Sequence, residues 1–211
     1  MKLGRLYVIV DAEVAGRRPL EEVTGEVLAG GAEVIQLRAK TWPARRLLEV
    51  GRNMLELCRR RGVPFLVNDR ADIARALGAD GVHLGQDDLP LEAARRLLGP
   101  GRIIGLSVDT LEEALAAEAA GADYVSLGPI FPTATKPDAG PVVGLEGLAR
   151  VRAGVSLPLV AIGGINADNA ARVLAAGADT VAVIGAVVGA DNVREATAAL
   201  RSVLTQGGES A

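Results

Sequence analysis

Several residue types are scarce in this chain of 211 residues, and each scarcity excludes a class of protein. A single cysteine, Cys58, allows neither an internal disulfide nor a thiolate metal cluster, and it indicates a reducing compartment. One tryptophan, two tyrosines and two phenylalanines are too few for a surface that stacks single-stranded nucleic acid. The uncharged apolar run at 180–190 is shorter than the roughly 20 residues of a membrane-spanning helix. We therefore expect a cytoplasmic protein without a membrane partner.

Charge and histidine content narrow the function further. The 23 basic side chains do not exceed the 26 acidic ones, so we expect no basic surface for a nucleic-acid duplex and no nucleic-acid partner. His83 is the one histidine, and no Ser-His-Asp, Cys-His or zinc pattern can be assembled around it. Hydrolysis through a covalent nucleophile is therefore disfavoured.

One short motif recurs four times along the chain. Each copy follows an alanine-rich helical segment, reads Gly-Ala-acid, and precedes a β-branched run. Glycine just past a helix end accepts the left-handed conformation, and the short loop then leads into a buried strand. The copies are Gly31-Ala32-Glu33, Gly78-Ala79-Asp80, Gly121-Ala122-Asp123 and Gly177-Ala178-Asp179. We interpret each as the joint between a helix and the next strand.

Eight short apolar runs alternate with eight amphipathic segments. The expected strands are 5–10, 33–37, 64–68, 81–84, 103–106, 123–128, 158–162 and 180–185. The expected helices are 20–29, 43–61, 71–77, 90–98, 111–120, 145–153, 167–176 and 191–205. Strict alternation predicts a parallel sheet, and eight units favour a closed barrel. The fold class is therefore an α/β protein with a compact single-domain (β/α)8 TIM barrel over 1–206, and 207–211 form a frayed C-terminal tail.

Polar residues follow the expected strands at the end where such barrels carry their chemistry. Gln36, Arg38 and Lys40 recur at period two, so they point to one side and form a clamp for a polyanion. The alternative is a solvated strand end. The chain has only three lysines, and Lys40 and Lys136 both fall at expected site loops, which favours a phosphate-type ligand.

Carboxylates end the expected third and fourth strands. Asp69 and Asp88 could share one magnesium ion, which uses one or two carboxylates together with substrate phosphates. The alternative is that each aspartate only caps the helix that follows it. We expect Mg²⁺ as the cofactor.

Two further segments suit a second anion. The long connection 129–144 carries Thr133, Ala134, Thr135 and Lys136 and is expected to act as a lid or clamp, although a stiff surface loop is the alternative. Gly163-Gly164 and Gly185 follow the last two strands, where barrels often bind phosphate through backbone N–H groups. His83 lies inside the expected fourth strand, where a packed core histidine is the alternative to a pocket residue.

Seven segments together resemble the thiamine phosphate synthase family. They are QLRAK at 36–40, VNDR at 67–70, GVHLGQDD at 81–88, GLS at 105–107, LGPIFPTATK at 127–136, AIGGI at 161–165 and AVI at 182–184. The resemblance implies a magnesium-dependent transferase. It would join 4-amino-2-methyl-5-hydroxymethylpyrimidine diphosphate to 4-methyl-5-(2-hydroxyethyl)thiazole phosphate, giving thiamine phosphate and diphosphate through a pyrimidine carbocation.

The resemblance also assigns residues. Those that would hold the pyrimidine diphosphate are Gln36, Leu37, Arg38, Ala39, Lys40, Asn68, Ser107 and Lys136, of which Arg38, Lys40, Ser107 and Lys136 would be catalytic. His83 is a further expected substrate-binding residue. Asp69 and Asp88 would bind magnesium. Those that would hold the thiazole phosphate are Thr133, Ala134, Thr135, Gly164, Ile184 and Gly185. The partners implied are these small-molecule substrates, with a homo-oligomer as a possibility.

Three positions depart from the family pattern. Ala39 stands where glutamate is common, Asp109 where histidine is common, and Gly185 where serine is common, so a hydroxyl contact to the thiazole phosphate is lost. Two alternatives stay open. The related thiazole tautomerase tends to carry a histidine where this chain has Pro129, and a non-catalytic paralogue would lose the aspartate pair.

Overall fold

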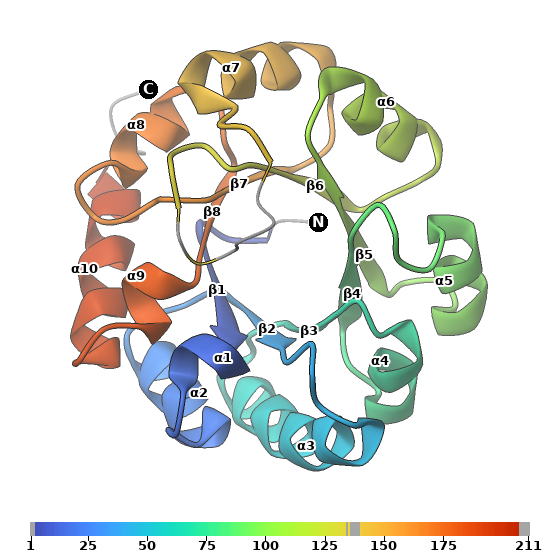
Figure 1. Cartoon of the computed structure of the whole chain (residues 1–211), viewed down its shortest axis with the longest axis vertical. Coiled ribbons are helices and arrows are strands. Elements are labelled where there is room, and N and C mark those ends of the chain that lie inside the picture. Colours follow the sequence, from blue (N-terminus) through green and yellow to red (C-terminus); the bar gives the residue numbers. More distant parts are fainter. Residues whose placement is uncertain (1–2, 134, 136–139, 207–211) are drawn as a thin grey trace.

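The computed structural model describes residues 3–133, 135 and 140–206. Eight parallel strands pair in chain order, and the last pairs with the first, so the sheet is a closed barrel (Figure 1). The strands are β1 (Leu6–Asp11), β2 (Val34–Arg38), β3 (Phe65–Asn68), β4 (Gly81–Leu84), β5 (Ile103–Val108), β6 (Tyr124–Leu127), β7 (Leu159–Ile162) and β8 (Thr180–Val183). The predicted (β/α)8 TIM barrel is confirmed; the tail predicted at 207–211 lies outside the described residues.

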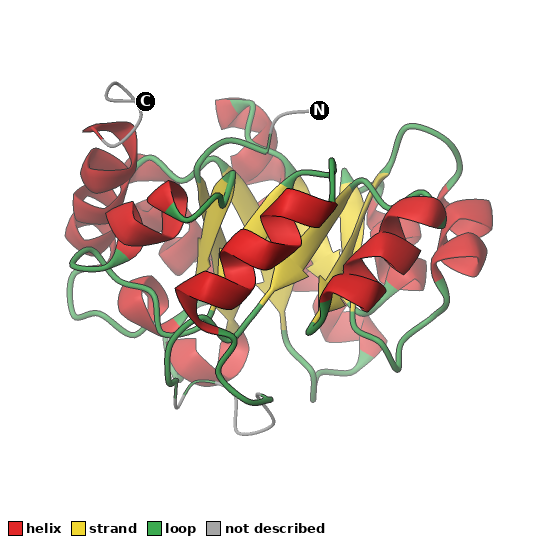
Figure 2. Ribbon diagram, turned by 90° about the horizontal axis from the view of Figure 1, so that it is seen from above, coloured by secondary structure: helices red, strands yellow, loops and turns green. Residues whose placement is uncertain are grey.

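Helices surround the strands on the outside of the barrel (Figure 2). They are α1 (Ala12–Ala15), α2 (Leu20–Ala29), α3 (Ala44–Arg61), α4 (Ala71–Leu77), α5 (Leu91–Leu98), α6 (Leu111–Ala119), α7 (Gly144–Gly154), α8 (Ala170–Ala175), α9 (Gly185–Val188) and α10 (Val193–Gln206). The predicted strict alternation of eight helices is wrong in one respect. The short helices α1 and α9 follow β1 and β8 directly, and at 4 residues each they are too short to show a helical period. Within the described part, none of the helices has the length and apolar character needed to cross a bilayer.

The barrel has two apolar layers because successive side chains of a strand point to opposite faces. On β1, Leu6, Val8 and Val10 pack toward the helices in the larger core. Tyr7 and Ile9 belong to a second cluster that fills the barrel interior. Side chains of this inner layer are therefore the ones that can line a cavity inside the barrel.

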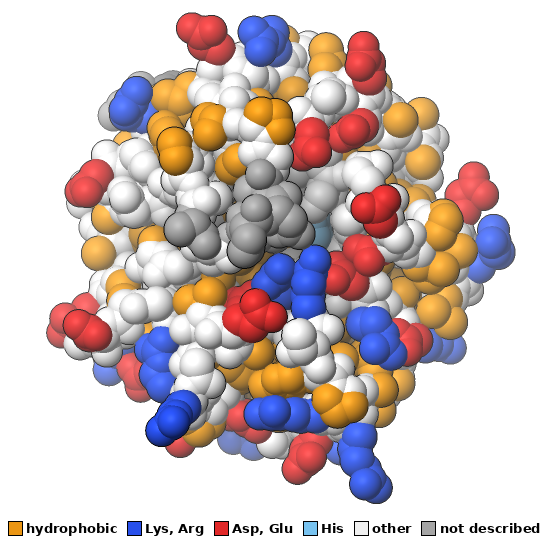
Figure 3. Space-filling model, in the orientation of Figure 1, with side chains coloured by type: hydrophobic (Ala, Val, Ile, Leu, Met, Phe, Trp, Pro, Cys, Tyr) orange, Lys and Arg blue, Asp and Glu red, His pale blue; other side chains and the backbone are white. Residues whose placement is uncertain are grey.

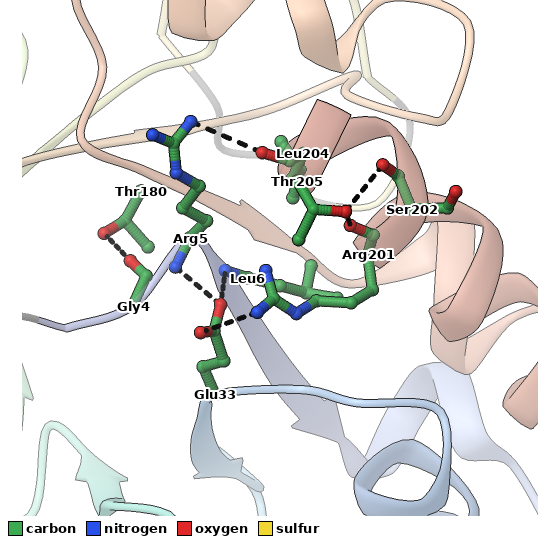
Figure 4. A network of polar contacts seen from close by, with 9 residues as sticks. All are labelled: Gly4, Arg5, Leu6, Glu33, Thr180, Arg201, Ser202, Leu204 and Thr205. Carbon is green, nitrogen blue, oxygen red and sulfur yellow. Dashed lines mark hydrogen bonds and ion pairs between the residues drawn. The ribbon is translucent and has the colours of Figure 1, made fainter. Parts of the chain in front are cut away.

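The acidic residue of each Gly-Ala-acid motif joins its strand to the strand before it. Glu33, one residue before β2, accepts hydrogen bonds from the backbone N–H groups of Arg5 at 2.7 Å and Leu6 at 3.1 Å, and it pairs with Arg201 of α10 (Figure 4). The other three motifs repeat the bond at 2.8 Å, from Phe65 to Asp80, from Ile104 to Asp123, and from Leu159 to Asp179. The motif thus fixes strand register as well as ending a helix.

A glycine in β5 creates space for one of the two tyrosine side chains of the barrel interior. Gly105 is aligned with His83 of β4 on one side and with Tyr124 of β6 on the other. A Cβ atom at Gly105 would lie 2.0 Å from Cζ of Tyr124, so the phenol ring occupies the place of a side chain. The ring reaches across β5 and stacks on His83, with ring centroids 5.5 Å apart.

We expect Gly105→Ala to lower the free energy of unfolding by at least about 1–3 kcal/mol, because the new methyl group overlaps the Tyr124 ring. Gly25→Ala is the matched control: it lies inside α2 with open space around the new Cβ, and it should stabilise by about 0.5–1 kcal/mol. Urea unfolding of both variants measures the difference. Equal stabilities would contradict the packing of Tyr124 over Gly105.

Candidate active site

A cavity of about 190 Å³ opens at the carboxyl ends of β5 to β8. Backbone, hydroxyl and small apolar groups form most of its wall. Its lining consists of Ser107, Val108, Asp109, Ser126, Gly128, Pro129, Thr133, Thr135, Gly140, Ile162, Gly163, Gly164, Ile165, Ala182, Val183, Ile184, Gly185 and Ala186. Among the described lining residues, Asp109 carries the charged side chain, and hydroxyl and backbone groups offer hydrogen bonds to a ligand.

A second cavity, of about 30 Å³, lies in the barrel interior beside the first. It is lined by Tyr7, Ile9, Gln36, Arg38, Asn68, His83, Ser107, Ser126, Ile162 and Ala182. Ser107, Ser126, Ile162 and Ala182 also line the larger cavity. The two spaces therefore adjoin, as the sites of two reacting molecules must.

The residues of the predicted cation clamp run from the barrel interior to the exposed end of β2. Gln36 and Arg38 are buried and line the smaller cavity, whereas Lys40 is exposed just beyond β2. Arg38 forms a buried ion pair with Asp11, whose other carboxylate oxygen accepts the backbone N–H groups that open α1. Asp11 therefore holds the guanidinium in place. In the space-filling view of Figure 3, basic and acidic side chains lie next to each other near the middle of the surface shown.

Two predicted binding residues face away from both cavities. The side chains of Leu37 and Ala39 are buried in the core between strands and helices, because they alternate with Gln36 and Arg38 along the strand. Only their backbone atoms are placed to meet a ligand. This position also accounts for the tolerance of alanine at 39, since its side chain does not contribute to the charged clamp.

The two aspartates predicted to bind a metal lie together. Burial raises the pKa of Asp69 to about 6, and the hydrogen bond and negative charge of Asp88 act in the same direction. The positive charges of Lys40 and Arg38 lower it. Asp88 accepts the backbone N–H of Gly85 at 2.6 Å, and Asp69 has a left-handed backbone, with φ of 61°. The two carboxyl groups therefore face each other, and one proton or cation placed between them would interact with both.

His83 occupies the centre of a polar cluster in the barrel interior. Its Nδ1 lies 2.8 Å from the Tyr124 hydroxyl, and its Nε2 lies 3.0 Å from Oγ of Ser107. Neither interpretation of His83 from the sequence was complete, because it is both packed in the interior and part of the cavity lining. Asn68 lies on the same wall.

The residues predicted to hold the second anion gather on the larger cavity. Thr133, Thr135, Gly164, Ile184 and Gly185 all line it. A Cβ atom at Gly185 would lie 2.9 Å from Oγ1 of Thr135, so the Thr135 hydroxyl stands next to the space that a serine side chain at 185 would use. Ala134 and Lys136 lie outside the described residues.

Three side chains that support the site were given no role from the sequence. Asp11, Tyr7 and Tyr124 hold Arg38, Gln36 and His83 respectively. A signal for Tyr7 and Asp11 was present, since they alternate along β1 with residues that pack outward. Tyr124 could not be found in this way, because its contact with His83 depends on the register of three strands.

Comparisons with known proteins identify the family. The family model described as thiamine monophosphate synthase matches residues 6–187. The chain belongs to the thiamine monophosphate synthase family. Thiamine-phosphate synthase from Moorella thermoacetica is 55% identical over 201 residues, which is 95% of this chain and 96% of that one. The Pyrococcus furiosus thiamine-phosphate synthase is 49% identical over 202 residues, 96% of this chain and 95% of that one.

Solved structures agree with this membership of the thiamine monophosphate synthase family. Thiamine phosphate pyrophosphorylase from Pyrococcus furiosus superposes with a TM-score of 0.89 at 47% identity, covering 97% of this chain and 96% of that chain. A thiamine phosphate pyrophosphorylase from Bacteroides thetaiotaomicron, at 18% identity and a TM-score of 0.72, shares the fold, covering 97% and 98%. None of these relatives is named as a tautomerase.

We expect Asp11→Asn to lower the free energy of unfolding by about 3 kcal/mol, because it leaves the buried Arg38 guanidinium without its counter-charge. Asparagine still caps α1, so the variant tests the charge alone. Asp72→Asn is the control, since the Asp72–Arg70 pair is exposed and its loss should cost under about 1 kcal/mol. If urea unfolding gives equal losses, Asp11 does not hold Arg38.

Proposed function

We propose that the protein joins the pyrimidine diphosphate to the thiazole phosphate named above, releasing diphosphate and forming thiamine phosphate. The observation that carries the proposal is the pair of adjoining cavities that share Ser107. Arg38, in an ion pair with Asp11, lines the smaller cavity together with amide, imidazole and hydroxyl side chains, and hydroxyl and backbone groups line the larger one. This division suits a diphosphate ester beside a phosphorylated acceptor.

The reaction needs no protein nucleophile. The bond between the pyrimidine methylene carbon and the diphosphate oxygen breaks, and its electron pair leaves with the diphosphate. The thiazole nitrogen then donates its lone pair to the same carbon. Arg38 and Lys40 stabilise the charge of the departing diphosphate, and the two cavities align the reactants. Charge stabilisation and alignment are the catalytic devices that these residues offer.

Gln36 gives the smaller cavity a polar group suited to the aminopyrimidine. Its Oε1 is buried without a hydrogen-bond partner among the described residues. A buried acceptor left unpaired costs about 1–3 kcal/mol, so this carbonyl favours a ligand that brings an N–H donor. The 4-amino group of the pyrimidine is such a donor, which supports placing that amino group at the smaller cavity, next to Gln36.

Asp69 and Asp88 fit a magnesium ion by their chemistry. Two neighbouring carboxylates attract a shared cation, and burial together with the nearby Asp88 raises the pKa of Asp69. The described residues contain no cluster of three or more metal-ligating side chains, a ligand count that leaves coordination positions for substrate phosphates and water. Bound magnesium would supply positive charge to the diphosphate. Asp69 and Asp88 would hold it.

A coupling assay with both substrates, over a magnesium titration, tests the proposed function. We expect thiamine phosphate and diphosphate to form in equal amounts and only with magnesium. Absence of product from a folded protein that still binds thiazole phosphate would contradict the synthase activity and favour a non-catalytic paralogue.

In the same titration, we expect Asp69→Asn and Asp88→Asn each to raise the magnesium concentration needed for activity at least about tenfold. Replacing residues that only hydrogen-bond to metal ligands already weakens metal binding by about this factor. Asparagine tolerates the left-handed backbone of Asp69, so the change tests the charge. Asp87→Asn, at the exposed neighbouring position, is the control. An unchanged magnesium requirement in both variants would remove the metal assignment.

Gly185→Ala tests the thiazole phosphate site. The new methyl group displaces the Thr135 hydroxyl, and we expect the KM for thiazole phosphate to rise roughly tenfold, the value of one hydrogen bond to a charged group. The KM for the pyrimidine diphosphate should stay unchanged. In a Thr135→Ala background the same substitution should have little further effect, because the overlap is gone. Additive effects of the two substitutions would contradict the proposed contact.

A further inference from the structure

Five side chains form a continuous line of hydrogen bonds through the barrel interior. Nε2 of Gln36 donates to the Tyr7 hydroxyl at 2.6 Å, and the Tyr7 and Tyr124 hydroxyl groups lie 3.2 Å apart. Tyr124 then meets Nδ1 of His83 at 2.8 Å, and Nε2 of His83 meets Oγ of Ser107 at 3.0 Å. The line begins at a buried amide and ends at the serine shared by the two cavities.

The amide at one end gives this line a direction. An amide nitrogen can only donate, so Tyr7 accepts from Gln36. The Tyr124 hydroxyl is the other hydrogen-bond partner of the Tyr7 hydroxyl among the described residues, so the buried Tyr7 proton is satisfied when Tyr7 donates to Tyr124. Burial, the largest cause, raises the pKa of both Tyr7 and Tyr124, so each phenol keeps its proton. Tyr124 accepts from Tyr7 and must then donate to Nδ1 of His83. A neutral imidazole that accepts at Nδ1 carries its proton on Nε2.

The last bond decides what Ser107 offers to a ligand. His83 donates from Nε2 to Oγ of Ser107, so the serine hydroxyl keeps its own proton for another acceptor. We propose that Tyr7 and Tyr124 are positioning residues, which fix the tautomer of His83 and thereby make Ser107 a hydrogen-bond donor to the substrate. The acceptor is a ring nitrogen or phosphate oxygen of the pyrimidine diphosphate, and this identity rests on the proposed function.

Packing holds the line in one geometry. The two phenol rings meet edge to face with centroids 6.2 Å apart, and Tyr124 stacks on His83 at an interplanar angle of 20°. Tyr7 and Tyr124 are 1% and 0% exposed. Tyr124 lies in the lining of neither cavity that the described residues form, so a ligand reaches it only through its neighbours. Its hydroxyl therefore acts on the substrate through His83 rather than by contact.

The single histidine makes the tautomer directly measurable. In protein labelled with 15N-histidine, His83 alone contributes imidazole signals, and the spectrum is recorded well above the ordinary histidine pKa of about 6.5. We expect a protonated Nε2 and an unprotonated Nδ1 that accepts a hydrogen bond. A proton on Nδ1 in the wild-type protein would overturn the proposal.

Gln36→Glu should reverse the donor and acceptor of each hydrogen bond in the line while keeping the same side chains in contact. A carboxylate only accepts, and Arg38 on the same strand face favours its ionised form. Tyr7 would then donate to position 36, Tyr124 to Tyr7, and His83 from Nδ1 to Tyr124. We expect the proton to move from Nε2 to Nδ1, and an unchanged tautomer in the folded variant would overturn the proposal.

Two further variants complete the spectroscopic test. Tyr124→Phe removes the partner of Nδ1, so the Nδ1 signal should shift, and in the Tyr124→Phe and Gln36→Glu double variant the reversal should fail to reach His83. Thr24→Val is the control, because it removes a buried hydroxyl that bonds only within α2. A shift in the control equal to that in Tyr124→Phe would show a general structural effect and overturn the proposal.

Kinetics of the same variants separate positioning from substrate identity. We expect Tyr124→Phe to lower kcat roughly tenfold, the value of one hydrogen bond to a charged group, with the KM for thiazole phosphate unchanged. An unchanged kcat in an active enzyme would overturn the positioning role. One outcome would separate the two proposals. If wild-type protein formed no thiamine phosphate, but His83 carried its proton on Nε2 and Gln36→Glu moved that proton to Nδ1, the proposed function would be wrong. The role of Tyr7 and Tyr124 in fixing the His83 tautomer would still be supported.

Discussion

The closed barrel depends on a hydrogen bond between a carboxylate and the backbone N–H of the preceding strand. Glu33, Asp80, Asp123 and Asp179 each stand directly before an even-numbered strand and bind the start of the odd-numbered strand before it. The barrel is thus four joined pairs of strands. Each carboxylate accepts a backbone N–H at or next to the first residue of its odd-numbered strand, and this bond favours one register for the pair.

Register set at one end of the strands determines the chemistry at the other. His83, Gly105 and Tyr124 form one row across β4, β5 and β6. A slip of one residue in β4 or β6 would turn the imidazole or the phenol into the outer core, and a slip in β5 would place a side chain where the Tyr124 ring now lies. The carboxylate before β6 and the glycine in β5 therefore act together: one places Tyr124 in the row, and the other leaves the space for its ring.

The sequence predicted the parts of this protein that depend on local patterns. Apolar runs and glycines after helices are visible within a few residues of chain, and the strand order, the helix joints and the cavity position of Gly164 and Gly185 followed from them. Contacts between distant strands did not. The pair of Asp11 with Arg38 spans 27 residues and the pair of His83 with Tyr124 spans 41, and both need a register that no local pattern encodes.

The backbone of Asp69 limits the side chains that this position can accept. Among the described residues it is the non-glycine residue with positive φ, a conformation open to glycine, asparagine and aspartate but costly for longer side chains. Glutamate would conserve the charge and strain the chain. The backbone conformation therefore limits the substitutions tolerated at position 69 more strictly than the charge does. Aspartate is the one acidic residue that has both the charge and a side chain short enough for this conformation, so a comparison of charges alone would wrongly rank glutamate as a conservative replacement.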